Sequence, residues 1–196
     1  MPSTPDAPLY GLVLIGGKSS RMGRDKAMLE YHDEPEWKRV LTMIQAQTTK
    51  AFISVNTEQA QSFEGVPQVL DSWDSIGPMN GVASALGEYP EAAWLVVACD
   101  MPNLNGELIQ QLVEARNLNC DATVFIEADE RLEPLCAIYE PQIVEGLLDS
   151  IMREDYSLFR CLEQQKIERV ALNDTQALKN INTAKESEMY RQHSVD

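Results

Sequence analysis

The chain has 196 residues, of which 44% are hydrophobic and 24% are charged, and these proportions are typical of a soluble globular domain. Its formal net charge is -15, from 16 Lys and Arg against 31 Asp and Glu, which argues against the broad basic surface that nucleic acids require. No run approaches the roughly 18–20 apolar residues of a membrane span, and the N-terminus lacks the basic and apolar regions of a signal peptide. We therefore expect a cytoplasmic protein without nucleic-acid or membrane partners.

Apolar runs alternate with helical patterns through residue 117. The expected strands are 9–17, 51–56, 66–71 and 94–100, and the expected helices are 35–47, 80–88 and 105–117. The strands are apolar almost throughout, as in a parallel sheet that is buried on both faces. Asn80 and Asn105 are placed to cap the last two helices. This order predicts right-handed βαβ crossovers and a mostly parallel α/β sheet with helices on both faces.

The second part of the chain has a different pattern. Strands are expected at 122–128 and 135–140 with DERLEP between them, helices at 141–152 and 157–165, a strand at 166–172 and a last helix near Thr183. No repeat or linker interrupts the chain. Residues 1–196 therefore read as one domain, with a core at about 9–190 between short tails.

A basic loop follows the first expected strand. Residues 16–26 read GGKSSRMGRDK and hold four of the sixteen basic side chains. Because the two glycines lack Cβ atoms, backbone amides here can approach a ligand closely and, with Lys and Arg, cradle a phosphate. Neither GxxxxGK[ST] nor GxGxxG occurs. The loop is either a phosphate site or a solvated turn whose charges balance nearby acids.

Two acidic residues, Asp71 and Asp100, each end an apolar run. Ligands of open α/β sheets bind beyond the carboxyl ends of the strands, where a carboxylate can hold Mg²⁺ together with substrate phosphates. Asp is also common in helix caps and turns, so both interpretations stay open. The two histidines lie in a polar turn and in the tail, which disfavours catalysis by a histidine base. Cys99 and Cys136 lie in apolar runs, so we expect reduced, buried thiols.

Five segments share their order with a known family over about residues 10–187. They read LIGGKSSRMGRDKAML, DSWDSIGPMNGVASAL, WLVVACDMPNL, EPLCAIYEP and NINTAKE. Together they resemble the nucleotidyltransferases that act on molybdenum cofactor, the MobA-like family, and above all its guanylyltransferases. The resemblance implies a Rossmann-like, three-layer nucleotide-diphospho transferase fold. It also implies transfer of GMP from GTP to the phosphate of molybdopterin cofactor, release of pyrophosphate, Mg²⁺ as cofactor, and cofactor-delivery proteins as partners.

The same resemblance assigns roles to individual residues. Arg21 and Lys26 would hold the triphosphate, Asp100 would bind Mg²⁺, and these three would form the catalytic set. The residues implied in nucleotide binding are Leu14, Ile15, Gly16, Gly17, Lys26, Asn56, Asp71, Gly77, Pro78, Gly81 and Asp100. Asn182 would contact the acceptor or the metal.

The sequence departs from the family pattern at two places. Ile15 stands where alanine is usual, which adds bulk where the nucleoside would pass, and Met79-Asn80 replaces the commoner Leu-Ala. Asn80 could therefore cap the next helix or meet the ligand. Gly16 and GPMNG favour guanine, because cytidylyl relatives usually carry LAAG and lack the GPLxG turn. Cytidylyl or other nucleotidyl transfer, to molybdopterin or another phosphorylated acceptor, stays open, as does a non-catalytic nucleotide-binding module.

Overall fold

A seven-stranded sheet forms the middle layer of the computed structural model, which describes residues 6–15, 34–73, 76–172, 174 and 176–181. The strands are β1 (Leu9–Leu14), β2 (Lys50–Val55), β3 (Gln68–Leu70), β4 (Ala93–Ala98), β5 (Ala122–Ile126), β6 (Leu132–Tyr139) and β7 (Ile167–Ala171). They lie in the order β3-β2-β1-β4-β6-β5-β7. The described pairs are parallel except where β6 joins β4 and β5. The predicted mostly parallel α/β sheet is confirmed.

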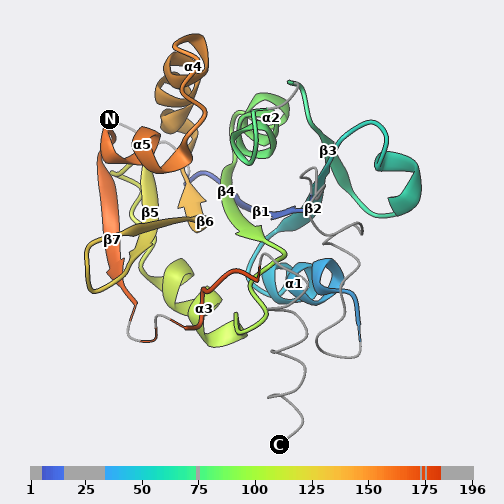
Figure 1. Ribbon diagram of the computed structural model, residues 1–196, viewed down its shortest axis with the longest axis horizontal. Coiled ribbons are helices and arrows are strands. Elements are labelled where there is room, and N and C mark those ends of the chain that lie inside the picture. Colours follow the sequence, from blue (N-terminus) through green and yellow to red (C-terminus); the bar gives the residue numbers. More distant parts are fainter. Residues whose placement is uncertain (1–5, 16–33, 74–75, 173, 175, 182–196) are drawn as a thin grey trace, which may run out of the picture.

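Helices cover both faces of the sheet, which makes the fold three-layered and Rossmann-like (Figure 1). One face carries α1 (Glu36–Gln45) and α3 (Gly106–Glu114). The other carries α2 (Met79–Glu88), α4 (Val144–Met152) and α5 (Leu158–Glu163). Two short 3₁₀ helices, η2 (Ala60–Phe63) and η3 (Pro141–Ile143), precede β3 and α4. The helices of the described chain are too short or too polar to span a bilayer.

Two hydrophobic clusters fill the spaces between the three layers. Val40, Ile44 and Ile109 belong to the cluster under α1 and α3, and Met79 and Leu147 to the cluster under α2, α4 and α5. Residues of β1 and β4 are buried along the whole of both strands. Their continuous apolar runs follow from this arrangement, because alternate side chains enter opposite clusters and neither face meets water.

Several local predictions were confirmed and two were wrong. Asn105 caps α3, since its side chain accepts a hydrogen bond from the Leu108 amide at 3.0 Å. Asn80 does not cap α2, because Pro78 holds the cap position and Asn80 lies inside the first turn. The four cysteines are free and buried, as expected for Cys99 and Cys136. The helix expected near Thr183 lies outside the described residues.

The segment expected to link two strands is itself largely strand. β6 begins at Leu132, inside DERLEP, and the hairpin from β5 closes where the Glu127 amide donates to the Arg131 carbonyl at 2.9 Å. Glu130 supplies the left-handed residue of this turn, with φ at 64°. The short turn moves Glu133 out of a loop and into the start of a strand.

Candidate active site

Polar residues from several strands meet at one edge of the sheet. Asn56, Asp71 and Asp100 follow β2, β3 and β4, and Ile15 follows β1. Because these four strands are parallel neighbours, their carboxyl ends share that edge, where ligands of open α/β sheets bind. Five site residues expected from the sequence, Gly16, Gly17, Arg21, Lys26 and Asn182, lie outside the described residues.

Asp71 is fixed beside the end of β2. Its amide donates to the Val55 carbonyl at 2.9 Å, and Ser54 Oγ donates to Asp71 Oδ1 at 2.7 Å. Burial raises the pKa of Asp71, while the Ser54 hydrogen bond lowers it. The carboxylate is therefore held in one orientation at the edge, half-buried, where a ligand hydroxyl can donate to it.

The GPMNG turn leads from Asp71 into α2. Gly77 has φ at 64°, in the left-handed region where glycine is favoured, and both it and Pro78 are exposed. Asn80 is buried, and its side chain accepts from the Trp73 amide at 3.1 Å and donates to the Trp73 carbonyl. Asn80 thus joins the segment after Asp71 to α2, and its side-chain amide forms hydrogen bonds within the protein.

The side chains at the end of β1 pack into the core. Ile15 is 3% exposed and belongs to the cluster under α1 and α3, whereas Leu14 belongs to the cluster on the other face. The extra bulk of Ile15 relative to alanine is therefore taken up by core packing, and the expectation that it enters the path of a nucleoside is corrected. The side chains of Leu14 and Ile15 are thus both buried in the core.

Asn56 closes the turn into η2. Its Oδ1 accepts from the Gln59 amide at 2.8 Å, and its own amide donates to Gln59 Oε1 at 3.3 Å. The residue lies at the same edge as Asp71 and is half-buried. Its side-chain oxygen is engaged locally, so a ligand contact by Asn56 would use the side-chain NH₂ group or replace this turn contact.

Asp100 leads into a compact turn that two other segments of the chain hold. Its carbonyl accepts from the Ile181 amide at 2.9 Å, and the Leu104 amide donates to the Met101 carbonyl at 3.1 Å. Arg39 of α1 donates to the carbonyls of Met101 and Leu104. The acidic side chain is half-buried, and the backbone after it is anchored both to α1 and to the segment that precedes residue 182.

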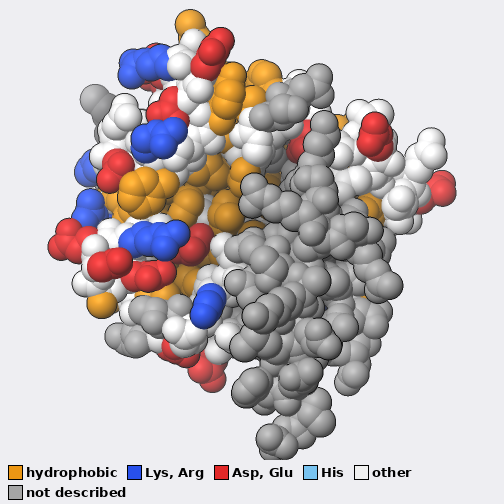
Figure 2. Space-filling model, viewed as in Figure 1, with side chains coloured by type: hydrophobic (Ala, Val, Ile, Leu, Met, Phe, Trp, Pro, Cys, Tyr) orange, Lys and Arg blue, Asp and Glu red, His pale blue; other side chains and the backbone are white. Residues whose placement is uncertain are grey.

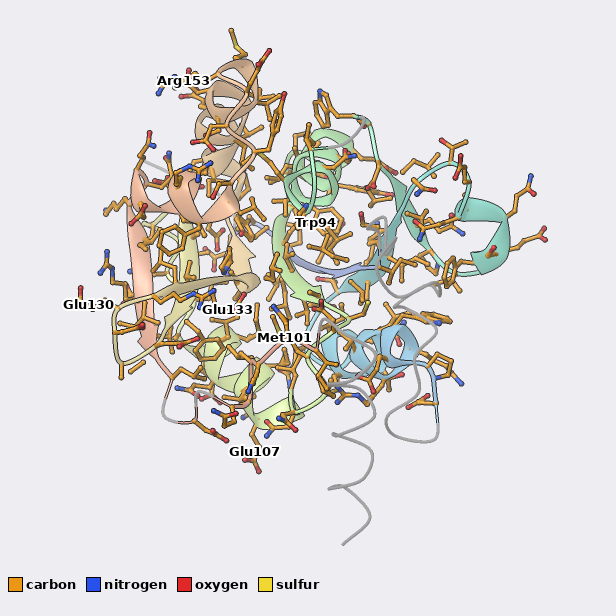
Figure 3. The ribbon with its side chains drawn as sticks, viewed as in Figure 1. Trp94, Met101, Glu107, Glu130, Glu133 and Arg153 are labelled. Atoms are coloured by element: carbon orange, nitrogen blue, oxygen red, sulfur yellow. The ribbon has the colours of Figure 1, made fainter. Side chains whose placement is uncertain are left out.

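Glu133 is a site residue that the sequence did not reveal. β6 is antiparallel to β4 with Val97 opposite Cys136, and the same register continued beyond β4 places Glu133 opposite Asp100. Figure 3 shows Glu133 on the side of the hairpin nearest Met101, whereas Glu130 lies at the outer end. Glu133 is half-buried, and its Oε1 accepts from the Leu135 amide at 3.0 Å.

The ionisation of Glu133 reflects this position. Its pKa is raised from 4.5 to about 7, chiefly by burial; the Leu135 hydrogen bond and Arg131 lower it, and the charges of Asp100 and Glu127 add to the rise. Asp100 is therefore close enough to Glu133 to be felt electrostatically. The available signal in the sequence was a carboxylate two residues before the apolar run LCAIY, which lies at this edge only if that run is antiparallel.

A family model described as the MobA-like NTP transferase domain matches residues 11–170, and this span includes the edge from Leu14 to Glu133. The chain belongs to this family. It is 33% identical over 187 residues to a probable molybdenum cofactor guanylyltransferase of Clostridium perfringens, covering 90% of this chain and 92% of that protein. It is also 37% identical over 137 residues to a molybdenum cofactor biosynthesis bifunctional protein of Synechocystis. That match covers 68% of this chain and 40% of the Synechocystis protein, so the chain spans less than half of that relative.

The fold of this MobA-like chain also matches a solved structure. Molybdopterin-guanine dinucleotide biosynthesis protein A of Archaeoglobus fulgidus superimposes with a TM-score of 0.79 at 20% identity, over 95% of this chain and 98% of that chain. The similarity is in the fold, and it extends over almost the whole length of both molecules.

The carboxylates at this MobA-like edge fit a divalent cation. Asp100 and Glu133 offer oxygen atoms, and Mg²⁺ commonly takes one or two protein carboxylates together with substrate phosphates. Within the described ranges, no group of three or more His, Cys, Asp or Glu side chains could hold a metal ion without a substrate. Two carboxylates would leave most coordination positions of a divalent cation to other oxygen ligands.

Two basic side chains of the second half are engaged in surface ion pairs. Arg153 and Arg160 are exposed on α4 and α5, where they pair with Asp149 and Asp155. Figure 2 shows Lys and Arg interspersed with acidic side chains over this part of the visible face. These arginines act as ordinary surface charges, whose ion pairs contribute little stability.

Gly81 lies in the first turn of α2, where the helix comes closest to the sheet. A Cβ there would meet Ser54 Oγ at 2.5 Å and Leu14 Cδ2 at 2.6 Å. Ser54 is the residue that orients Asp71, so the absence of a side chain at position 81 lets α2 rest on the strands without disturbing that hydrogen bond.

Gly81→Ala is expected to lower the free energy of unfolding by about 1–3 kcal/mol, because overpacking forces the helix or Ser54 to shift. Gly87→Ala in the same helix is the matched control, since nothing lies within 4 Å of a Cβ there. That control should be neutral or stabilising by up to about 1 kcal/mol through helix propensity. Urea unfolding of both variants checks this, and equal stability of the two would contradict the close packing at Gly81.

Proposed function

We propose that this chain transfers GMP from GTP to the phosphate of molybdopterin cofactor, releasing pyrophosphate and forming the molybdopterin guanine dinucleotide cofactor. The observation that carries the proposal is similarity to a probable molybdenum cofactor guanylyltransferase over nine-tenths of both chains. The acidic edge around Asp100 supports it, since nucleotidyl transfer needs a place for a cation and phosphates. The proposal includes cofactor-delivery proteins as partners, as the sequence resemblance implies, and the cytoplasmic location expected from the composition and the N-terminal sequence.

The chemistry joins two anions, which defines what the protein must do. An oxygen of the acceptor phosphate forms a bond to the α-phosphorus of GTP as the bond from that phosphorus to the α,β-bridging oxygen breaks. Pyrophosphate leaves with that electron pair. No acyl intermediate and no histidine base are needed. Positioning and neutralisation of charge supply most of the rate enhancement.

The residues divide by the side of Asp100 on which they lie. On the β1–β3 side, the backbone at Leu14 and Ile15, Asn56, Asp71 and the Gly77-Pro78 turn would contact the nucleoside. The basic loop with Arg21 and Lys26 would hold the triphosphate. On the β6 side, beside Glu133, the acceptor would bind. Asn182 would meet the acceptor or the cation, which the Ile181 hydrogen bond to Asp100 supports.

Asp100 would hold Mg²⁺ together with phosphate oxygens of GTP. When bound, the ion neutralises negative charge on the phosphates as the reaction proceeds. The role of the protein is to hold this carboxylate in the correct place and to keep the turn after Asp100 rigid. Glu133, opposite in the sheet register, adds a second carboxylate to the same edge.

Calorimetry with GTP, CTP, ATP and UTP, each with and without Mg²⁺, tests the proposal on the wild-type chain and on Asp100→Ala. We expect GTP to bind at least about tenfold more tightly than CTP with Mg²⁺, which corresponds to about 1.4 kcal/mol. The dependence on Mg²⁺ should disappear in Asp100→Ala. Preference for CTP would replace guanylyl by cytidylyl transfer, and absence of nucleotide binding would overturn the enzymatic proposal. Pyrophosphate release on adding molybdopterin cofactor then identifies the acceptor.

A further inference from the structure

A buried ion pair lies at the start of α1, the helix that follows the basic loop in sequence. Arg39 Nε and Nη2 donate to Glu36 Oε2 at 3.0 and 2.8 Å. The Glu36 side chain is 0% exposed and the Arg39 side chain is 14% exposed. Charges this deeply buried are retained only where hydrogen bonds satisfy them, so the remaining donors of Arg39 must also have partners.

Those remaining contacts reach the turn that directly follows Asp100. Arg39 Nη1 donates to the Leu104 carbonyl at 2.7 Å, and Nη2 donates to the Met101 carbonyl at 3.1 Å. Met101 and Leu104 are themselves buried and joined by the hydrogen bond that closes the turn. A single guanidinium group therefore grips both ends of the turn, while Glu36 holds the guanidinium.

The consequence for Asp100 follows from covalent geometry. Asp100 and Met101 share one planar peptide unit, and the Met101 carbonyl belongs to the next unit. Because the Asp100 carbonyl is also held by the Ile181 amide, fixing the Met101 carbonyl leaves few backbone torsions through which the Asp100 carboxylate can move. A misplacement of about 1 Å at a reacting centre can cost about 100-fold in rate. The planar guanidinium presents donors on three nitrogens to Glu36 and to the two carbonyls, and a lysine ammonium, with its donors on one nitrogen, cannot reproduce this geometry.

We propose that Arg39, oriented by Glu36, is a positioning residue that sets the place of the Asp100 carboxylate for the divalent cation. The inference rests on the proposed function, in which Asp100 holds the cation. Arg39 contacts neither nucleotide nor cation in this proposal and acts through the Met101–Leu104 turn. It also ties the helix after the triphosphate loop to the turn after Asp100, so that the two halves of the site keep one geometry.

The chain contains a matched control pair at the opposite edge of the sheet. Arg116 Nε donates to Glu140 Oε1 at 2.6 Å, with side-chain exposures of 15% and 1%. Arg116 Nη2 also donates to a backbone carbonyl, that of Ala7, at 2.9 Å. Ala7 precedes β1, so this pair lies at the amino ends of the parallel strands. Removing either arginine disrupts the same chemistry at the same burial, but only Arg39 adjoins Asp100.

The test uses Mn²⁺ as the probe, with a GTP analogue whose α,β-bridging oxygen is replaced by a methylene group. Electron paramagnetic resonance of free Mn²⁺ gives the dissociation constant of the ion in the nucleotide complex of the full chain. Arg39→Lys and Arg39→Met are expected to raise that constant by about tenfold, the lower range for supporting residues of metal sites. Arg116→Lys and Arg116→Met should change it less than twofold.

Kinetics provide a second measurement, which a loss of stability by itself would not change. In both Arg39 variants, the Mg²⁺ concentration for half-maximal rate should rise and kcat should fall, while the KM for GTP stays within about twofold. Circular dichroism identifies the variants that remain folded. If Arg39→Met does not fold, the test rests on Arg39→Lys, because lysine keeps a positive charge beside Glu36. Wild-type Mn²⁺ affinity in a folded Arg39 variant, or equal loss in the Arg116 variants, overturns the positioning role.

Asp100→Asn separates this inference from the proposed function. If Asp100→Asn leaves Mn²⁺ affinity unchanged, Asp100 is not the cation ligand and both proposals about the cation fail. If Asp100→Asn weakens Mn²⁺ binding but the Arg39 variants do not, only the positioning role fails. The double variant Arg39→Met/Asp100→Asn should bind Mn²⁺ no more weakly than Asp100→Asn alone, because Arg39 acts through Asp100.

Discussion

Asp100→Asn is expected to slow guanylyl transfer by about 10³-fold at saturating GTP and Mg²⁺. Asparagine keeps the shape of the side chain but removes the charge that would hold the cation between the protein and the phosphates. A correctly held cation supplies several kcal/mol of charge stabilisation, and each 1.36 kcal/mol corresponds to about a tenfold change in rate. The rate of pyrophosphate release in the presence of molybdopterin cofactor measures the effect.

Asp149→Asn is the control for the loss of one negative charge. Asp149 is exposed and pairs with Arg153, and it lies on α4, which covers the face of the sheet opposite α1 and α3. This variant should retain the wild-type rate, because an exposed ion pair is weak and has no part in the site. If Asp100→Asn retains more than a tenth of the wild-type rate while folded, the cation role of Asp100 is wrong.

Glu133→Gln is expected to stabilise the protein at pH 8 by about 2–3 kcal/mol when nucleotide and divalent cation are absent. Burial raises the pKa of Glu133 from 4.5 to about 7. Between these values the folded chain binds more protons at this residue than the unfolded chain does, so raising the pH through this window lowers stability. Glutamine stays neutral and keeps an oxygen that can accept from the Leu135 amide, so the variant avoids the loss.

The sign of this effect gives it a diagnostic pH dependence. The stability difference between Glu133→Gln and wild type should be largest above pH 7 and should fall towards zero near pH 4.5. Urea unfolding at several pH values measures it. Glu130→Gln, an exposed change of the same charge in the same hairpin, should show a difference of less than about 0.5 kcal/mol at each pH. A Glu133→Gln difference that does not vary with pH would contradict the burial of an ionisable carboxyl group here.

The order of strands and helices was readable from the sequence because periodicity is a local property. The runs that became β1 and β4 are apolar at successive positions, and only a strand covered on both faces can bury such a run. Asp71 and Asp100 could be placed at one edge for the same reason. Once the strands that precede them are parallel, their carboxyl ends coincide.

The direction of β6 was not readable in this way, and Glu133 was missed with it. The residues of a strand look the same whichever way it pairs, and here its neighbours β4 and β5 make it antiparallel. The beginning of β6 therefore lies at the edge where the parallel strands β1 to β4 end. A carboxylate that appeared to belong to a connecting loop became a neighbour of Asp100.

The sequence by itself determined the elements, their apolar faces and the edge where Asp71 and Asp100 meet, because these depend on neighbouring residues along the chain. Only the tertiary structure decided that Arg39 grips the turn after Asp100 and that Gly81 makes room for Ser54. It also decided that Asn80 binds the backbone of Trp73 and that Ile15 packs into the core. Each of these depends on which atoms meet across the packed layers, and such distances between segments far apart in the chain are set by the whole fold.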